Sequence, residues 1–261
     1  MITSAHNPRV KQAVCLRDHR QRRKEQLILI DGVRELARAI TAGVALREVF
    51  VCPELCRSEE ARRLLENLPG SAQRFDVTEA VFAKLAFGQR SEGVVGVAEV
   101  PRQCLEDIVL PTNPLVAVLE GVEKPGNIGA VLRSADGAGI SALVVADLRT
   151  DLFNPNVIRA SLGTIFSLPV AAAAPGDVLA WLRGRGLQIL AARVEGSVSY
   201  TEIDYRQPTA IVLGSEAQGL TSLWSGDGVR AIRLPMLGMA DSLNVSTAAA
   251  VLFYEALRQR T

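Results

Sequence analysis

The hydrophobic and polar positions divide the chain into two blocks, each alternating strand-like and helix-like patterns. In the first block, the strand-like runs are Leu27–Asp31, Val49–Cys52, Gln73–Val77 and Val94–Val100. Between the first two runs, apolar residues recur at helical spacing over Val33–Ala42, and Gly43 follows where a helix commonly ends. This alternation predicts a small sheet covered by helices.

The second block has more continuously apolar strand patterns, at 115–119, 142–146, 187–192 and 210–214, and a further strand is expected at 229–234. Uninterrupted apolar runs are typical of parallel strands buried on both faces. A last helix is predicted to begin near Asn244, because its apolar residues from Val245 onward form one stripe. The pattern alone predicts a doubly wound open sheet, since knotted chains are very rare. The short alanine tract at 171–174 is assigned no element.

A joint between the blocks is marked by three prolines, Pro101, Pro111 and Pro114. The predicted organisation is a first α/β domain at 1–105, a linker at 106–113 and a second domain at 114–261.

Composition places the chain among ordinary globular proteins, with 48% hydrophobic and 22% charged residues. No apolar run approaches the roughly 20 residues that a membrane span needs. The N-terminal segment lacks the apolar core of a secretory signal, so a cytoplasmic protein without a membrane partner is expected.

The net charge of +1 conceals a basic N-terminal segment, in which residues 1–34 carry eight Lys or Arg and three acidic residues. Such a segment favours a polyanionic partner, although it is also compatible with a solvated helix end. The side chains predicted to contact RNA are Arg9, Lys11, Arg20, Arg22, Arg23 and Lys24.

No metal site is predicted. Cys52 and Cys56 are spaced as CPELC, but no second pair of Cys or His completes a zinc site. We interpret both thiols as buried or half-buried side chains.

Glycine and small polar residues gather in three segments that each follow a predicted strand: 123–139, 214–220 and 235–246. Open α/β sheets bind ligands at the carboxyl ends of their strands. The three segments are therefore predicted to form one pocket, whose contacts come largely from backbone groups.

The residue inventory excludes several chemistries in the second block. Both histidines, His6 and His19, lie in the basic segment, and neither a phosphate-binding loop nor a dinucleotide fingerprint is present. The polar side chains that remain suit orientation and charge stabilisation rather than covalent catalysis: Asn127, Arg133, Glu216, Ser242 and Asn244. Each also has a structural interpretation. Asn127 would cap a helix expected to run through Ala130–Ala135, with Arg133 on its solvated face, Ser242 and Asn244 would cap the last helix, and Glu216 would be a loop carboxylate.

Those segments resemble the three signature motifs of the SpoU (TrmH-like) class of RNA ribose 2′-O-methyltransferases, within the SPOUT superfamily. The similar stretches are NIGAVLR at 127–133, LGSEAQGL at 213–220 and LPMLGMADSLNVSTAAAVLFYEAL at 234–257, in the order that the family has them. The first block more weakly resembles the ribosomal-protein-like substrate domain of many relatives, through NPRVKQ at 7–12 and DG at 31–32.

The resemblance implies an α/β SPOUT domain with a parallel sheet and a deep trefoil knot, preceded by a small α/β substrate-binding domain. It implies a homodimer and the cofactor S-adenosylmethionine. Arg133 would be the catalytic arginine, helped by Asn127, Glu216, Ser242 and Asn244. The implied cofactor-binding residues are Leu213, Gly214, Glu216, Gly219, Leu234, Met236, Ser242 and Leu243.

The implied substrate is RNA, with 23S-type ribosomal RNA favoured over tRNA. We expect Arg133 to stabilise charge on the 2′-oxygen and to hold a neighbouring phosphate, because a guanidinium is a poor base. Two alternatives to methyl transfer remain: a non-catalytic RNA-binding dimer with the same fold, and a nucleotide-dependent oxidoreductase, which the missing glycine fingerprint disfavours.

Overall fold

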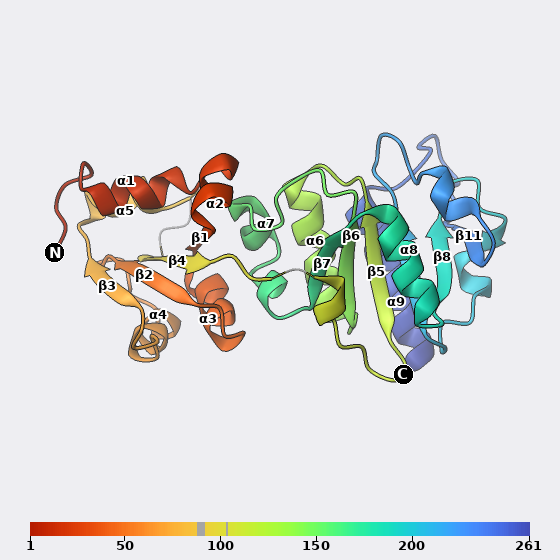
Figure 1. Cartoon of the computed structure of the whole chain (residues 1–261), viewed down its shortest axis with the longest axis horizontal. Coiled ribbons are helices and arrows are strands. Elements are labelled where there is room, and N and C mark those ends of the chain that lie inside the picture. The colour runs from red at the N-terminus through yellow and green to blue at the C-terminus, as the bar shows by residue number, and fades with distance from the viewer. Residues whose placement is uncertain (88–91, 103) are drawn as a thin grey trace. The chain divides into compact units, whose positions relative to one another are not determined.

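The computed structural model describes residues 1–87, 92–102 and 104–261, and its contacts divide the chain into two compact units (Figure 1). The N-terminal unit contains Met1–Pro101 and Asp151–Ser167, and the C-terminal unit contains Arg102–Thr150 and Leu168–Thr261. The predicted organisation placed residues 151–167 in the second domain, whereas here they pack within the N-terminal unit.

The N-terminal unit is a four-stranded sheet covered by short helices. Along the chain its elements are α1 (Pro8–Cys15), α2 (His19–Glu25), β1 (Leu27–Asp31), α3 (Val33–Thr41), β2 (Leu46–Val51), α4 (Glu59–Glu66), β3 (Gln73–Asp76), α5 (Glu79–Leu85), β4 (Val94–Glu99) and α7 (Pro155–Ala160). The strand order is β1-β4-β2-β3, in which β4 is antiparallel to both neighbours and β2 is parallel to β3. The four predicted strands are confirmed, and β2 begins three residues earlier than predicted.

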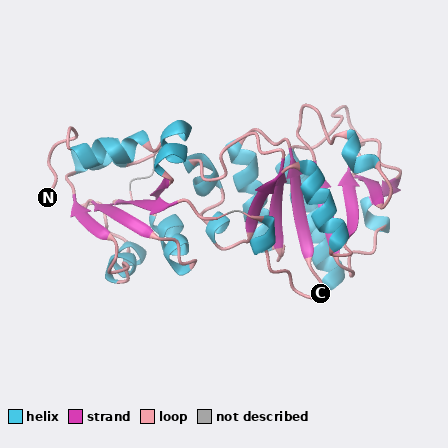
Figure 2. Ribbon diagram, in the orientation of Figure 1, coloured by secondary structure: helices cyan, strands magenta, loops and turns pink. Residues whose placement is uncertain are grey.

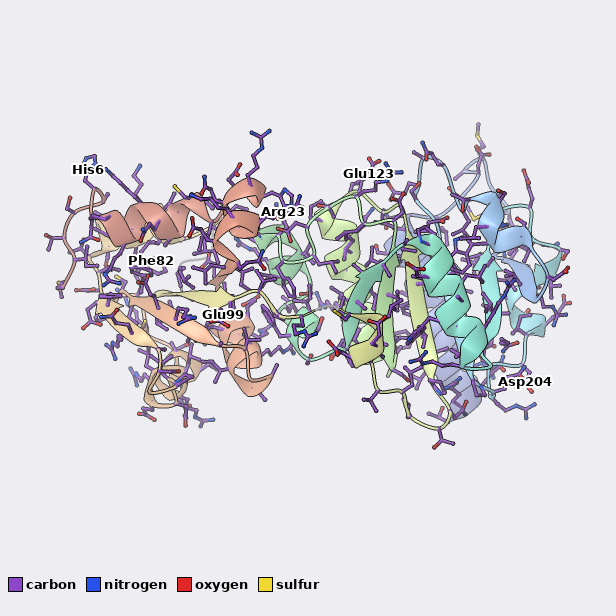
Figure 3. The ribbon with its side chains drawn as sticks, in the orientation of Figure 1. His6, Arg23, Phe82, Glu99, Glu123 and Asp204 are labelled. Atoms are coloured by element: carbon purple, nitrogen blue, oxygen red, sulfur yellow. The ribbon has the colours of Figure 1, made fainter. Side chains whose placement is uncertain are left out.

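The core of this unit lies between α1, α5 and the sheet. Phe50 of β2 and Phe82 of α5 are fully buried there together with Val10 and Leu85. Figure 3 shows Phe82 between the helices and the strands. Burying one aromatic side chain of this size contributes about 1.5–3 kcal/mol relative to leaving it exposed.

The segment 151–167 completes the N-terminal unit through a buried charge. α7 packs against β1, and Asp151 accepts a hydrogen bond of 2.6 Å from Nε of Arg22. The Arg22 guanidinium is only 2% exposed and also donates to the carbonyls of Leu16 and Arg17. A charge in such a position needs this full set of acceptors, because an unpaired buried charge is very unfavourable.

The C-terminal unit is built on a seven-stranded sheet. Its elements are β5 (Leu115–Glu120), α6 (Pro125–Gly137), β6 (Ala142–Ala146), β7 (Val170–Ala173), α8 (Pro175–Gly184), β8 (Gln188–Ala192), β9 (Val198–Ser199), β10 (Thr209–Leu213), β11 (Val229–Arg233) and α9 (Val245–Arg260). The order is β7-β6-β5-β10-β8-β11-β9, and every neighbouring pair is parallel. The predicted parallel, doubly buried strands are confirmed for β5, β6, β8 and β10, whereas β11 is partly exposed and both β7 and β9 were missed.

Helices cover both faces of this sheet (Figure 2). On one face, α8 packs Val178, Leu182 and Trp181 onto a cluster that includes Val118 and Trp224. Figure 1 shows α8 in front of the strands and α9 behind them, where α9 packs against α6. This layering leaves the ends of the strands as the places where loops can gather.

A C-terminal arginine holds α9 in place. The Arg260 guanidinium donates to four backbone carbonyls, those of Asn113 (2.9 Å), Pro114 (3.1 Å), Tyr205 (2.7 Å) and Gln207 (2.7 Å). These residues precede β5 and β10, so the last turn of α9 is anchored at the amino ends of the strands. The first turn of α9 is thereby directed toward their carboxyl ends.

Among the described residues, no helix is long and apolar enough to cross a membrane. The same part of the chain contains no group of three or more His, Cys, Asp or Glu side chains that could hold a metal ion.

Candidate active site at the carboxyl ends of the strands

Four adjacent parallel strands of the C-terminal unit, in the order β5-β10-β8-β11, end at the same edge of the sheet. The loop after β5 leads into α6, the loop after β10 spans 214–221, and the loop after β11 leads into α9. The three segments that the sequence analysis selected therefore meet at one edge, as the parallel arrangement requires.

A cavity of about 330 Å³ opens among these loops. All eight residues predicted to bind the cofactor line it: Leu213, Gly214, Glu216, Gly219, Leu234, Met236, Ser242 and Leu243. Arg193, Glu195 and Asp241 also line it, and the sequence analysis had not selected them. The volume lies at the lower end of the range that is common for small-molecule pockets.

The loop after β10 makes a very close turn on itself. Gly219 donates its N–H to the carbonyl of Ser215 at 2.9 Å, and the Ser215 hydroxyl accepts from Gln218 N–H at 3.1 Å. A Cβ on Gly214 would lie 2.2 Å from the carbonyl carbon of Gly219, so only glycine fits at position 214. Gly219 itself has a φ of 64°, which favours glycine for a second reason.

The far end of the same loop is held by a clamp of buried polar groups. Glu120, at the end of β5, is 2% exposed and accepts hydrogen bonds from the Thr221 N–H (2.8 Å) and hydroxyl (2.9 Å). Arg193 donates to the carbonyls of Leu220 (3.2 Å) and Thr221 (2.7 Å). A buried carboxylate is rarely tolerated without such partners, and here it fixes one wall of the cavity.

A hydrogen-bonded cluster joins the three loops around the carboxylate of Glu216. Its Oε1 accepts from the side-chain amides of Asn127 (3.0 Å) and Asn244, and its Oε2 accepts from the Lys124 ammonium at 2.8 Å. The Asn244 amide also reaches Oδ1 of Asn127 at 3.3 Å. The hydrogen bond from Lys124, first among several causes, holds the pKa of Glu216 below its usual value.

The two asparagines differ in whether they cap a helix. Asn244 is the N-cap of α9, where its Oδ1 accepts from Ser246 N–H at 2.9 Å, so it caps a helix and also joins the cluster. Asn127 is not a cap, because α6 begins earlier, at Pro125, after the N-cap Lys124. The structural interpretation of Asn127 is therefore wrong, and its amide is committed to the cluster.

Arg133 stands apart from the cluster. It lies on α6 with an exposed side chain, and within the described parts of the chain its guanidinium makes no hydrogen bond or ion pair. Arg133 lies six helical positions beyond Asn127, so the two side chains leave α6 about 120° apart around the helix axis. Its guanidinium is therefore free to bind a ligand from solution.

The basic side chains predicted to contact RNA lie in the N-terminal unit, and one of them does not suit that role. Arg22 is buried with its guanidinium engaged by Asp151 and two carbonyls, so it serves the fold and is withdrawn from the RNA-binding set. The other five are exposed: Arg9, which pairs with Glu48 at 2.5 Å, Lys11, Arg20, Arg23 and Lys24.

Comparison with known proteins identifies the family. Residues 114–254 match the model of the SpoU rRNA Methylase family, which is more than half of the chain. The chain belongs to the SpoU rRNA methylase family. Residues 7–96 match the MRM3-like substrate binding domain, in agreement with the resemblance noted for the first block.

Relatives of this SpoU protein are similar over nearly the whole length. A 23S rRNA (uridine(2479)-2′-O)-methyltransferase of Streptomyces viridochromogenes is 32% identical, over 99% of this chain and 92% of the relative. A crystal structure of an RNA 2′-O ribose methyltransferase is 41% identical with a TM-score of 0.87, covering 99% of this chain and 98% of that one. The SpoU methyltransferase AviRb from Streptomyces viridochromogenes, in complex with AdoMet, is 30% identical with a TM-score of 0.88 and covers 98% of both chains.

Sequence analysis of this SpoU protein missed three residues of the site. These are Lys124, Glu120 and Arg193. Each forms its hydrogen bonds with a residue distant in the sequence, 92 residues away for Lys124, 101 for Glu120 and 27 for Arg193. Lys124 stands out only once the start of α6 is known, because a lysine at an N-cap goes against the usual choice of capping residue.

Proposed function

We propose that this protein is an S-adenosylmethionine-dependent RNA ribose 2′-O-methyltransferase that acts on large-subunit ribosomal RNA. The observation that carries the proposal is the convergence of the three motif loops. Their eight expected cofactor-binding residues line one cavity, and the Glu216 cluster joins the same loops beside it.

The residues around the cavity fit S-adenosylmethionine. Leu213, Leu234, Met236 and Leu243 offer apolar surface for an adenine ring, while Glu195, Asp241 and Ser242 offer acceptors and hydroxyls for ribose and amino groups. Arg193 adds a buried Nε that has no partner among the described residues. When bound, the cofactor supplies an electrophilic methyl group on its sulfonium sulfur.

The chain's own residues must aim and activate a weak nucleophile, because a ribose hydroxyl loses its proton reluctantly. Arg133 suits this role, because its exposed guanidinium can hold the adjacent phosphate and stabilise charge that develops on the 2′-oxygen. Glu216 is unsuited as a base, since both of its oxygens already accept hydrogen bonds and its pKa is lowered, chiefly by Lys124. Phosphate or water would then take the proton.

Two observations support ribosomal RNA as the substrate. The family model that matches 114–254 is one of rRNA methylases, and a substrate-binding domain matches 7–96. The exposed cations of the N-terminal unit, foremost Arg20, Arg23 and Lys24 on α2, would provide phosphate contacts, which give affinity without sequence information. The substrate would be methylated in the cytoplasm.

A homodimer is part of the proposal. Leu237 and Met239 in the loop before α9 are fully exposed, and Tyr254 on α9 is 51% exposed. Apolar side chains of this size gathered on one unit are suited to cover a partner surface. Sedimentation at low micromolar concentration should give twice the chain mass, and a monomer would contradict this part.

A trefoil knot of the C-terminal segment is proposed as well. Membership in the SpoU rRNA methylase family supports it, because the resemblance of the three motifs implies this knot. A knotted chain pulled at its ends in an optical trap should extend less than its full contour length.

The function is tested by two measurements on the full chain. Calorimetry should detect binding of S-adenosylmethionine, and mapping of 2′-O-methyl groups in RNA from cells with and without the protein should reveal a site in large-subunit rRNA. A site in tRNA would redirect the substrate assignment. RNA binding without any new methyl group would instead establish a non-catalytic RNA-binding protein.

A further inference from the structure

Lys124 occupies a position where the local rules of helix structure disfavour it. It is the N-cap residue of α6, and its side chain makes no capping hydrogen bond. Ser, Thr, Asp or Asn normally occupies an N-cap, and a cation there faces the positive end of the helix dipole. Residues that break a local rule are commonly found at functional sites, so the contact that Lys124 makes instead bears on its role.

That contact is with Glu216, in the loop after β10. The Nζ–Oε2 distance is 2.8 Å, and the two side chains are 72% and 30% exposed. The other donors to this carboxylate are neutral: the amides of Asn127 and Asn244 and the N–H of Val245. Among the described residues that line the neighbouring cavity, the charged ones besides Glu216 are Arg193, Glu195 and Asp241. Lys124 is the cation that contacts the carboxylate.

The position of this carboxylate determines how the two asparagine amides are oriented. Both amides direct Nδ2 at Oε1 of Glu216, so their oxygens face the other way. Oδ1 of Asn244 then caps α9 through Ser246, and Oδ1 of Asn127 faces the Asn244 amide. If the carboxylate rotated away, both amides would lose their common acceptor, and the loops after β5, β10 and β11 would lose a shared junction.

We propose that Lys124 is a positioning residue of the methyl-transfer site, whose ammonium fixes the Glu216 carboxylate and thereby the amides of Asn127 and Asn244. The inference rests on the proposed function, in which these groups orient the RNA ribose. Lys124 acts through Glu216 and takes no part in binding the cofactor.

The test uses the full chain and a saturating concentration of RNA. Lys124→Met removes the charge and keeps most of the side chain, whereas Lys124→Arg keeps the charge. The matched control is Arg206→Met, because Arg206 is also 72% exposed and pairs with a carboxylate, that of Asp204, at 2.9 Å. The control pair lies far from the site. Asp204 and Arg206 precede β10, whereas Glu123, the sequence neighbour of Lys124, follows β5. Figure 3 shows Glu123 and Asp204 at opposite ends of the sheet.

For Lys124→Met we expect kcat to fall at least tenfold, while the Kd for S-adenosylmethionine changes less than threefold. Tm should stay unchanged or rise, because the substitution removes a cation from the positive end of the α6 dipole. Lys124→Arg should restore most of kcat, and Arg206→Met should behave as wild type. A purely structural role would lower Tm and would not separate kcat from cofactor affinity in this way.

A double-mutant cycle decides whether Lys124 acts through Glu216. Once Glu216→Gln is present, Lys124→Met should lower kcat by less than twofold further. Fully additive losses would overturn the proposal, since Lys124 would then act on the RNA directly. An unchanged kcat in Lys124→Met would overturn it too. If wild-type protein methylates no RNA, the proposed function fails instead, so the two failures are distinguishable.

Discussion

At the scale of single residues, burial separates arginines that serve the fold from those that can serve a ligand. Arg22 is 2% exposed with all of its contacts inside the N-terminal unit, whereas Arg133 is exposed and, where the structure describes the chain, unpartnered. The sequence presents Arg22 within a basic run and Arg133 after an apolar stretch, and neither context indicates which guanidinium is buried. Only the fold shows that one guanidinium is already committed.

Arg133→Ala should lower kcat by about 100-fold or more, because a group that stabilises developing charge acts mainly in the transition state. Cofactor affinity should remain nearly unchanged, since Arg133 is not among the residues that line the cavity. Methylation assays and calorimetry check both expectations. Asp136→Ala, an exposed change on the same helix, is the control. A loss of only a few-fold would remove Arg133 from the mechanism.

Thr221→Val should destabilise the protein by about 1–3 kcal/mol, because Oε1 of the buried Glu120 loses its hydrogen-bond donor. It should also weaken binding of S-adenosylmethionine, since the clamp holds one wall of the cavity. Urea unfolding and calorimetry measure the two effects. Thr221→Ser keeps the hydroxyl and should behave as wild type; equal cofactor affinity in the Ser and Val variants would show that the clamp does not shape the cavity.

At the scale of elements, apolar patterns predicted the strands well where burial on both faces enforces them. β6 and β1 have the bounds that the patterns indicated, and β5 and β10 are within a residue or two. β7, Val170–Ala173, was missed because an alanine-rich run has little apolar bulk and weak strand preference. The start of α6 was placed too late, because Lys124 and Pro125 give no side-chain capping signal.

In the candidate site, too, local sequence patterns predicted some features and missed others. Its three loops were found because strand ends, small residues and family motifs coincide in the sequence. The clamp of Glu120 with Thr221 and the contact of Lys124 with Glu216 were not found, because each joins loops about 100 residues apart. Local patterns carry no signal for such pairs, which depend on strand order.

α2 offers an element-scale test of RNA binding. Replacing Arg20, Arg23 and Lys24 together by Gln should weaken RNA binding and reduce the salt dependence of log K by about 2, because each lost phosphate contact removes roughly 0.7–0.9 from the slope. Filter binding at several salt concentrations measures this, and cofactor affinity should not change.

The matched control for α2 is the triple replacement of Arg57, Arg62 and Arg63 by Gln. It removes the same charge from exposed positions in and beside α4, where Glu59 and Glu60 offset the positive potential. Equal effects of the two triple variants would mean that net charge alone, and no particular helix, governs RNA affinity.

At the scale of the whole molecule, the chain passes between the two units three times, after Pro101, Thr150 and Ser167. The segment 151–167 buries Phe153, Val157 and Ile158 and brings Asp151 to Arg22. The N-terminal unit is therefore built from two stretches of sequence, which the proline-marked joint near residue 101 could not reveal.

Asp151→Asn should destabilise the N-terminal unit by about 2–3 kcal/mol, because the buried Arg22 guanidinium loses its counter-charge and keeps only two carbonyl acceptors. Both tryptophans, Trp181 and Trp224, lie in the C-terminal unit, so their fluorescence follows that unit alone. Hydrogen exchange of β1 amides should report the loss while tryptophan fluorescence unfolds as in wild type.

Asp147→Asn is the control for that change. Asp147 lies four residues before Asp151 and forms an exposed ion pair with Arg149, which the substitution breaks. Such a surface pair contributes at most about 1 kcal/mol to stability. If both variants leave the exchange of β1 unaltered, the Arg22–Asp151 pair contributes nothing measurable to the N-terminal unit.

The three passages also have a consequence for synthesis on the ribosome, where domains generally fold in the order in which they emerge. Here the core between α1, α5 and the sheet is complete once residue 101 leaves the exit tunnel, but Arg22 still lacks Asp151 and β1 still lacks α7, which ends at residue 160. The nascent chain must therefore carry an incomplete N-terminal unit while β5, α6 and β6 are already being delivered to the second unit. Translation of residues 102–167 is thus the interval in which the Arg22 guanidinium is without its counter-charge and β1 is without its covering helix.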